Sequence, residues 1–162
     1  MIKYYKEYNN IFNPEEIQEL ETICNGVEFY DYTTDTGRKD NNRISADGLQ
    51  PKITKFLKKF PIKCWGQFMN QKPNVIVEKH TDEIPSGWPL RTKLLTPLYH
   101  NNNVPLNFYN KNNEILASCN YQYGKSVLIN TQQLHGFKNN NYERYTFQVC
   151  FAESFDEIEK IL

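Results

Sequence analysis

The sequence has no long apolar run and no closely spaced cysteines. None of its apolar runs approaches the roughly eighteen residues of a transmembrane helix. The N-terminus, MIKYYKEYNN, has no apolar stretch like that of a secretory signal. The four cysteines, at positions 24, 64, 119 and 150, form no CxxC pair. Their isolation argues against a zinc framework and, without a signal peptide, indicates a reducing compartment, so we expect a cytoplasmic protein.

An excess of charge of either sign is also absent. The chain has 19 Lys and Arg against 19 Asp and Glu, and its pI is about 6.8. Such a chain has no overall attraction for nucleic acid or anionic lipid, so we expect neither nucleic acid nor a membrane as a partner. A small molecule, a peptide or a protein remains as the substrate class. Frequent Asn, Lys, Tyr and Ile are typical of an AT-rich genome, bacterial or phage.

The length and the spread of apolar residues predict a single folded domain. The chain has 162 residues, and 39% of them are hydrophobic. Two independent cores would be cramped in this length, and the even distribution of Leu, Ile, Val and Phe argues against disorder. We therefore predict one domain over 1–162, with helical support over about 1–60, a β core over about 62–151 and a short helix over about 155–162.

Two helices are predicted in the first sixty residues. The first covers about 14–24, because Asn13 is a good N-cap and Glu16 stands at the third helical position. The second covers about 51–60, where apolar residues recur at helical spacing. The polar stretch 31–50 between them is predicted to be a long surface loop, and loops of that length often serve function.

From residue 62 onward the pattern changes to that of β-strands. Short apolar segments alternate with turns rich in Asn, Gly or Pro, which is typical of an antiparallel sandwich or barrel. The predicted strands cover about 62–69, 74–80, 91–99, 105–109, 114–122, 126–130 and 143–151. Helices followed by many strands give an α+β, mainly β, protein whose helices pack on one face of a sheet.

Three residues are candidate metal ligands. His80 and Asp82 stand two positions apart, so on a strand their side chains point to the same side. An HxD pair alone often arises by chance, but His135 offers a further imidazole. Two imidazoles and one carboxylate on one face of an iron ion leave its opposite positions open, unlike the closed tetrahedral shell of structural zinc.

The strand at 143–151 carries a candidate anion-binding residue. Arg144 and Thr146 share one face of this strand, and aromatic and aliphatic residues occupy the other. Arg binds a carboxylate in a two-pronged geometry, and a neighbouring hydroxyl adds a third hydrogen bond. The alternative is an ordinary half-buried strand with its arginine in water.

The order of these residues resembles the iron(II)- and 2-oxoglutarate-dependent oxygenases, nearest to the prolyl and aspartyl/asparaginyl hydroxylases. The matching parts are HTD at 80–82, LLTPL at 94–98, GKSVLIN at 124–130, LHG at 134–136 and RYT at 144–146. The resemblance implies a double-stranded β-helix, a jelly-roll or cupin-like core, with N-terminal supporting helices. It also implies that His80, Asp82 and His135 bind Fe(II), so that these three form the catalytic centre.

The same resemblance implies a cosubstrate site and a reaction. Arg144 would pair with the distal carboxylate of 2-oxoglutarate, with Thr146 as a second contact. Other members add a Tyr, Asn or Arg from a second strand, and among Arg91, Lys93 and Tyr99 we favour Tyr99. With O₂, the reaction would hydroxylate a C–H bond of an amino-acid side chain, peptidyl or free, and release succinate and CO₂.

One departure and two alternatives accompany this resemblance. Animal prolyl hydroxylases commonly have Lys where this sequence has Arg144. A cupin-like metal-dependent hydrolase or isomerase would use the same three ligands without 2-oxoglutarate. A catalytically silent β-sandwich that only binds a partner would not need an intact ligand set.

Overall fold

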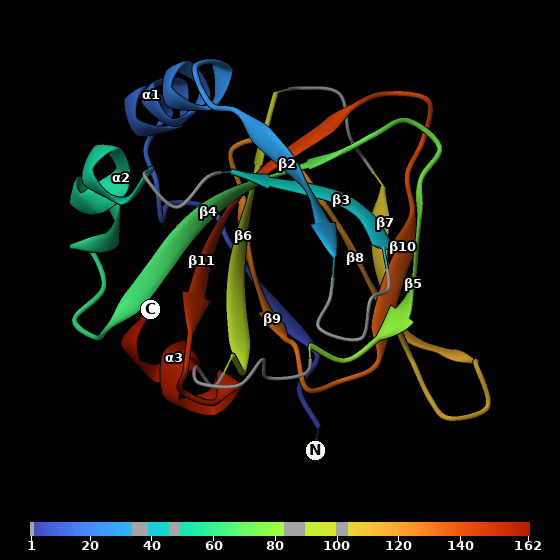
Figure 1. Cartoon of the computed structure of the whole chain (residues 1–162). Coiled ribbons are helices and arrows are strands. Elements are labelled where there is room, and N and C mark those ends of the chain that lie inside the picture. The colour runs from blue at the N-terminus through green and yellow to red at the C-terminus, as the bar shows by residue number, and fades with distance from the viewer. Residues whose placement is uncertain (1, 34–38, 46–48, 83–89, 100–103) are drawn as a thin grey trace.

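Two antiparallel sheets face each other, and the helices lie outside the larger sheet (Figure 1). The computed structural model describes residues 2–33, 39–45, 49–82, 90–99 and 104–162. Within these residues the major sheet has the order β1 (Tyr5–Tyr8), β9 (Ser126–Asn130), β6 (Thr92–Leu98), β11 (Arg144–Phe151), β4 (Cys64–Gln71), β3 (Lys39–Ser45), β2 (Phe29–Thr33). The minor sheet has the order β5 (Ile76–His80), β10 (His135–Lys138), β7 (Pro105–Tyr109), β8 (Ile115–Asn120).

The central strand β11 decides which side chains face the space between the sheets. It pairs along its whole length with β4 and, from Tyr145 onward, with β6. Phe147 and Val149 pack on the helix side of the sheet. Because successive side chains alternate, Arg144, Thr146 and Gln148 point toward the minor sheet. Arg144 is buried there, so the alternative of an arginine in water is wrong.

The predicted helices are present and lie over one face of the major sheet. Helix α1 (Pro14–Asn25) starts with a reciprocal capping box in which Asn13 and Glu16 bind each other's backbone N–H groups. Helix α2 (Gln50–Leu57) and the short C-terminal helix α3 (Phe155–Ile161) follow the predicted ranges closely. No helix within the described residues is long and apolar enough to cross a membrane.

Two hydrophobic clusters hold these layers together. One joins the three helices to the outer face of the major sheet through side chains such as Leu20, Ile53, Phe147 and Ile158. The other fills part of the space between the two sheets and consists of Val77, Leu95, Val104, Leu106, Phe108, Cys119, Tyr121, Val127, Ile129 and Phe137. The inward-facing polar residues of β11 therefore lie next to an apolar core.

The predicted helical support and surface loop both contain strands instead. β1 extends one edge of the major sheet by pairing with β9, and β2 and β3 extend the other edge through β4. The segment 31–50, expected to be a loop, therefore supplies most of β2 and β3, and 34–38 and 46–48 lie outside the described residues. Strand β10 is also additional to the predicted set.

Candidate metal and cosubstrate site

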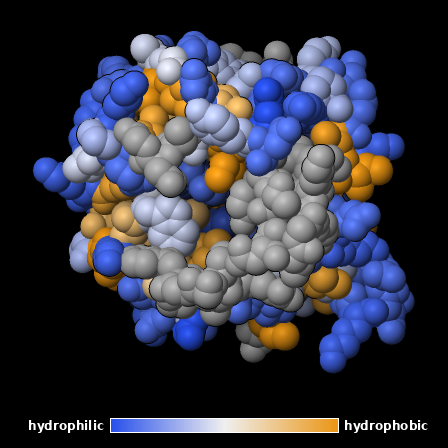
Figure 2. Space-filling model, in the orientation of Figure 1, coloured by the Kyte–Doolittle hydropathy of each residue, from blue (hydrophilic) through white to orange (hydrophobic). Residues whose placement is uncertain are grey.

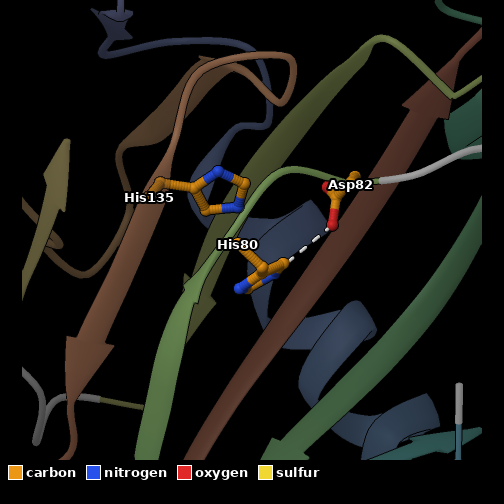
Figure 3. Close-up of side chains that lie close together, drawn as sticks. All are labelled: His80, Asp82 and His135. Atoms are coloured by element: carbon orange, nitrogen blue, oxygen red, sulfur yellow. Dashed lines mark ion pairs between the residues drawn. The ribbon is translucent and has the colours of Figure 1, made fainter. Parts of the chain in front are cut away.

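Strand pairing brings the three predicted metal ligands together. His80 ends β5 and stands directly opposite His135, the first residue of β10. Two residues after His80, the backbone N–H of Asp82 donates to the carbonyl of Thr131 over 3.0 Å. The potential ligand atoms of the three side chains lie within 4.8 Å of one another. Figure 3 shows both imidazoles and the carboxylate directed into one small space.

A glycine allows β10 to run close to β5 at this point. The pairing register shifts between His135 and Phe137, which marks a bulge. A Cβ atom at Gly136 would lie 2.8 Å from the carbonyl oxygen of Val77, closer than real side chains approach backbone. The LHG sequence around His135 therefore has a structural reason for its glycine.

Hydrogen bonds fix the tautomer of both imidazoles. Nδ1 of His80 lies 2.7 Å from the carbonyl oxygen of Glu78, and Nδ1 of His135 lies 2.8 Å from that of Gln133. A carbonyl oxygen only accepts, so each Nδ1 carries the proton and donates it. Each Nε2 then keeps its lone pair for a metal ion, the usual arrangement of a ligand held by a backbone carbonyl.

The protonation states of the candidate ligands also suit a metal ion. Burial alone would raise the pKa of Asp82, but the ammonium group of Lys93 foremost holds it below its ordinary value. Nζ of Lys93 lies 2.8 Å from Oδ2 of Asp82, and Nε2 of His80 lies 3.5 Å from Oδ1. Burial lowers the pKa of His135 to about 4 against the opposing effect of Asp82. At neutral pH Asp82 is therefore ionised and His135 is neutral, the forms that bind metals.

The donor set fits iron(II) with open coordination positions. Among the described residues, these two imidazoles and one carboxylate are the side chains whose ligand atoms lie close enough together to hold a metal ion. Two histidines and one carboxylate on one face are typical of non-haem iron that must bind further ligands. A structural zinc site would be closed by a fourth protein ligand.

Arg144 lies between the sheets without a charged partner. Its side chain is 2% exposed, and its Nε and Nη1 atoms are buried without a hydrogen-bond acceptor. Across the described part of the chain, no carboxylate forms an ion pair with it. An unpaired buried guanidinium is costly unless a ligand supplies an anion, so the residue fits a carboxylate-bearing molecule. Thr146 is buried two positions along on the same face, as predicted from the alternation.

Tyr99, the predicted second-strand contact, lies elsewhere. Its hydroxyl donates to the carbonyl of Glu21 over 3.0 Å and to Oδ1 of Asn25 over 2.8 Å, so it fastens β6 to α1. By alternation Tyr99 would share the inner face with Lys93. However, it follows the last residue of β6 and has a φ of 63°, which turns the chain away. From β6 it is Lys93 that reaches the site.

Solved structures with a similar fold cover most of this chain. A Pseudomonas putida prolyl-4-hydroxylase gives a TM-score of 0.62 at 13% identity, covering 91% of this chain and 91% of that chain. A prolyl hydroxylase from Trichoplax adhaerens, in complex with a hypoxia inducible factor peptide fragment, gives 0.64 at 15%, covering 96% and 85%. A Burkholderia pseudomallei oxidoreductase of the 2OG-Fe(II) oxygenase family gives 0.60 at 10%, covering 90% and 84%. Comparisons with protein-family models and with curated proteins give no match.

The chain has the fold of the iron(II)- and 2-oxoglutarate-dependent oxygenases. This confirms the predicted double-stranded β-helix, whose two halves are the major and minor sheets. The oxygenase fold here carries an intact cluster of His80, Asp82 and His135. The sequence singled out these three candidate ligands and Arg144, but not the two aromatic rings that contact Arg144, Tyr121 and Phe137. Nothing in the spacing of these two residues links them to Arg144, because they meet it only through the packing of the two sheets.

Proposed function

We propose that this protein is an iron(II)- and 2-oxoglutarate-dependent oxygenase that hydroxylates a C–H bond of an amino-acid side chain. The observation that carries the proposal is the combination of two sites in one space between the sheets. One is a three-ligand cluster whose protonation states suit a divalent metal, and the other is a buried arginine that lacks an anion. A metal-dependent hydrolase would need the three-ligand cluster but not the buried arginine.

Each residue has a defined task in this reaction. His80, Asp82 and His135 would hold Fe(II), and Arg144, assisted by Thr146, would bind the distal carboxylate of 2-oxoglutarate. Bound iron supplies the oxidation, in which one oxygen atom of O₂ enters the C–H bond and the other enters succinate as CO₂ leaves. Arg144 orients the cosubstrate, and the apolar cluster between the sheets limits the access of water.

The experiment that tests this proposal is anaerobic addition of Fe(II) and 2-oxoglutarate to the metal-free protein. We expect the weak visible charge-transfer band of the iron chelate in the wild type and its loss in Asp82→Ala. Arg144→Met should keep the affinity for metal but lose the band at the same 2-oxoglutarate concentration. A folded, metal-loaded wild type without the band would contradict the use of 2-oxoglutarate and favour a hydrolase or isomerase.

The substrate class is supported by the similar structures named above. Two of them are described as prolyl hydroxylases, and one of these holds a peptide fragment. Figure 2 shows a hollow near the centre of one face, and the residues that are coloured on this face are mostly hydrophilic. We therefore expect the substrate to be an amino-acid side chain, either of a peptide in solution or of a free amino acid.

A library of proline-, aspartate- and asparagine-containing peptides tests this expectation beside the free amino acids. Succinate formation above the uncoupled background should appear with at least one of them, together with a mass increase of one oxygen atom in the substrate. Stimulation by none of these, in a protein that does bind iron and 2-oxoglutarate, would rule out these amino-acid substrates while leaving the reaction class intact.

A further inference from the structure

Two aromatic rings contact the guanidinium of Arg144. Its Cζ atom lies 3.6 Å from the centre of the Tyr121 ring and 4.6 Å from that of the Phe137 ring. All three side chains are at most 7% exposed. Arg144 belongs to the major sheet, whereas Phe137 lies in β10 of the minor sheet and Tyr121 directly follows β8. The contact therefore spans the interior between the two sheets.

The rings stand where a buried arginine ordinarily has a carboxylate. A ring face attracts a cation through its quadrupole, but it neither neutralises the charge nor occupies the in-plane N–H groups. The Nε and Nη1 atoms accordingly remain buried and unpaired. A protein carboxylate in this place would compete with the carboxylate of a ligand, whereas two rings stabilise the cation and leave it available.

Strand β10 links this aromatic pair to the metal ligands. Phe137 stands two residues after His135, and Gly136 between them lies at the bulge where β10 approaches β5. Because one short strand carries both a metal ligand and a ring that touches Arg144, the separation of the metal site from the guanidinium is set locally. A cosubstrate that must span the two points needs this separation to be fixed.

We propose that Tyr121 and Phe137 are positioning residues that hold the Arg144 guanidinium for the distal carboxylate of 2-oxoglutarate. This inference rests on the proposed function. It assigns to the two rings a role in cosubstrate affinity beyond their contribution to the core.

Two chelating ligands separate this role from a general structural one. Oxalate and 2-oxoglutarate both bind a metal ion through adjacent oxygens, but only 2-oxoglutarate has a distal carboxylate. In the Mn²⁺-loaded protein, Tyr121→Leu and Phe137→Leu should each weaken 2-oxoglutarate binding about tenfold, as expected for the loss of a desolvated cation–π contact. The affinities for Mn²⁺ and for oxalate should stay within about twofold of the wild type. Titration calorimetry measures all three.

Two further variants serve as controls. Tyr121→Phe retains the ring and loses only the hydroxyl, so it should weaken 2-oxoglutarate binding less than Tyr121→Leu does. Phe60→Leu removes a buried ring from the helix-side cluster, far from Arg144 in the packing, and should leave this affinity unchanged. If a leucine variant does not fold, the corresponding methionine variant has about the same volume but a more flexible side chain that fills irregular gaps, and it gives the same comparison.

The outcomes separate failure of this inference from failure of the proposed function. Wild-type protein that binds Mn²⁺ and oxalate but not 2-oxoglutarate, or Arg144→Met that binds it normally, would overturn the proposed function. Loss of 2-oxoglutarate binding in Arg144→Met, together with unchanged binding in both leucine variants, would overturn the inference alone. Equal weakening of oxalate and 2-oxoglutarate in the leucine variants would also overturn it, because the rings would then support the whole site.

Discussion

At the scale of single residues, the charged side chains between the two sheets differ in whether they have a charged partner. Asp82 and Lys93 form an ion pair at the candidate metal site, with side chains only 12% and 13% exposed. Arg144, by contrast, meets rings instead of an acid. The folded protein therefore carries one neutralised pair and one unneutralised cation in the same region. This arrangement keeps Asp82 ionised and leaves the guanidinium of Arg144 able to receive an anion.

The ion pair of Lys93 makes a prediction at the residue scale. Lys93→Met should destabilise the metal-free protein by about 3–5 kcal/mol, because it leaves the buried carboxylate of Asp82 without its partner. Urea unfolding at neutral pH measures the change. The double variant Asp82→Asn, Lys93→Met should be more stable than Lys93→Met, since neither charge then remains. Additive losses in the two single variants and the double variant would show that the pair does not interact.

At the scale of elements, the site depends on how β10 approaches β5. The pairing of His135 with His80 is set by a four-residue strand that contains a bulge. Asp82 is held in turn by a backbone hydrogen bond to Thr131. Backbone pairing and a backbone hydrogen bond thus hold the candidate metal ligands in place.

Gly136→Ala therefore should damage metal binding more than the size of the change suggests. The added Cβ would lie 2.8 Å from the Val77 carbonyl oxygen, so β10 must move away from β5 and carry His135 with it. We expect a Mn²⁺ affinity at least about tenfold weaker, the lower end of the effect of disturbing a ligand's support. Electron paramagnetic resonance of free Mn²⁺ measures it. Gly26→Ala, where the nearest atom is 3.7 Å away, is the matched control and should bind like the wild type.

The sequence predicted the elements that carry a strong local pattern. Helix α1 has a cap and an apolar stripe, and β11 alternates cleanly, so both were expected close to their observed bounds. Strand β3 reads KDNNRIS, which lacks any apolar alternation, and it exists because it pairs with β4. Strand β10 has four residues, too few to show an alternating pattern in the sequence. Tyr99 shows the same limit, because a positive φ at the strand end overrides the parity of its position.

At the scale of the whole molecule, the protein buries thiols and phenols that ionise only with difficulty. Burial raises the pKa of Cys24, Cys119 and Cys150 to about 12, and that of Tyr121 also to about 12. The three thiols are free. Cys24 lies in α1 and the helix-side cluster, Cys119 in β8 and the cluster between the sheets, and Cys150 on the inner face of β11. Because these thiols are packed in their neutral forms, their ionisation opposes folding.

Stability should consequently decrease as the pH rises above about 9. A raised pKa in the folded state means that the folded protein binds more protons than the unfolded chain between the ordinary thiol pKa and about 12. The stabilisation is complete below the ordinary value and is lost across that window, by up to about 1.4 kcal/mol per pH unit for each such thiol. Urea unfolding between pH 8 and pH 10.5 measures the slope.

Cys150→Ala measures how much one thiol contributes to the pH dependence of the unfolding free energy. Cys150 is fully buried on the inner face of β11, so its truncation should lower stability at every pH by creating a small cavity. It should also make the alkaline decrease shallower, because one thiol no longer resists ionisation. Cys64→Ala is the comparison variant, since Cys64 is less buried and its pKa rises only to about 11, so its contribution to the decrease should end about one pH unit lower than that of Cys150. A decrease of the same steepness in wild type and Cys150→Ala would mean that this thiol ionises as readily in the folded protein as in the unfolded chain.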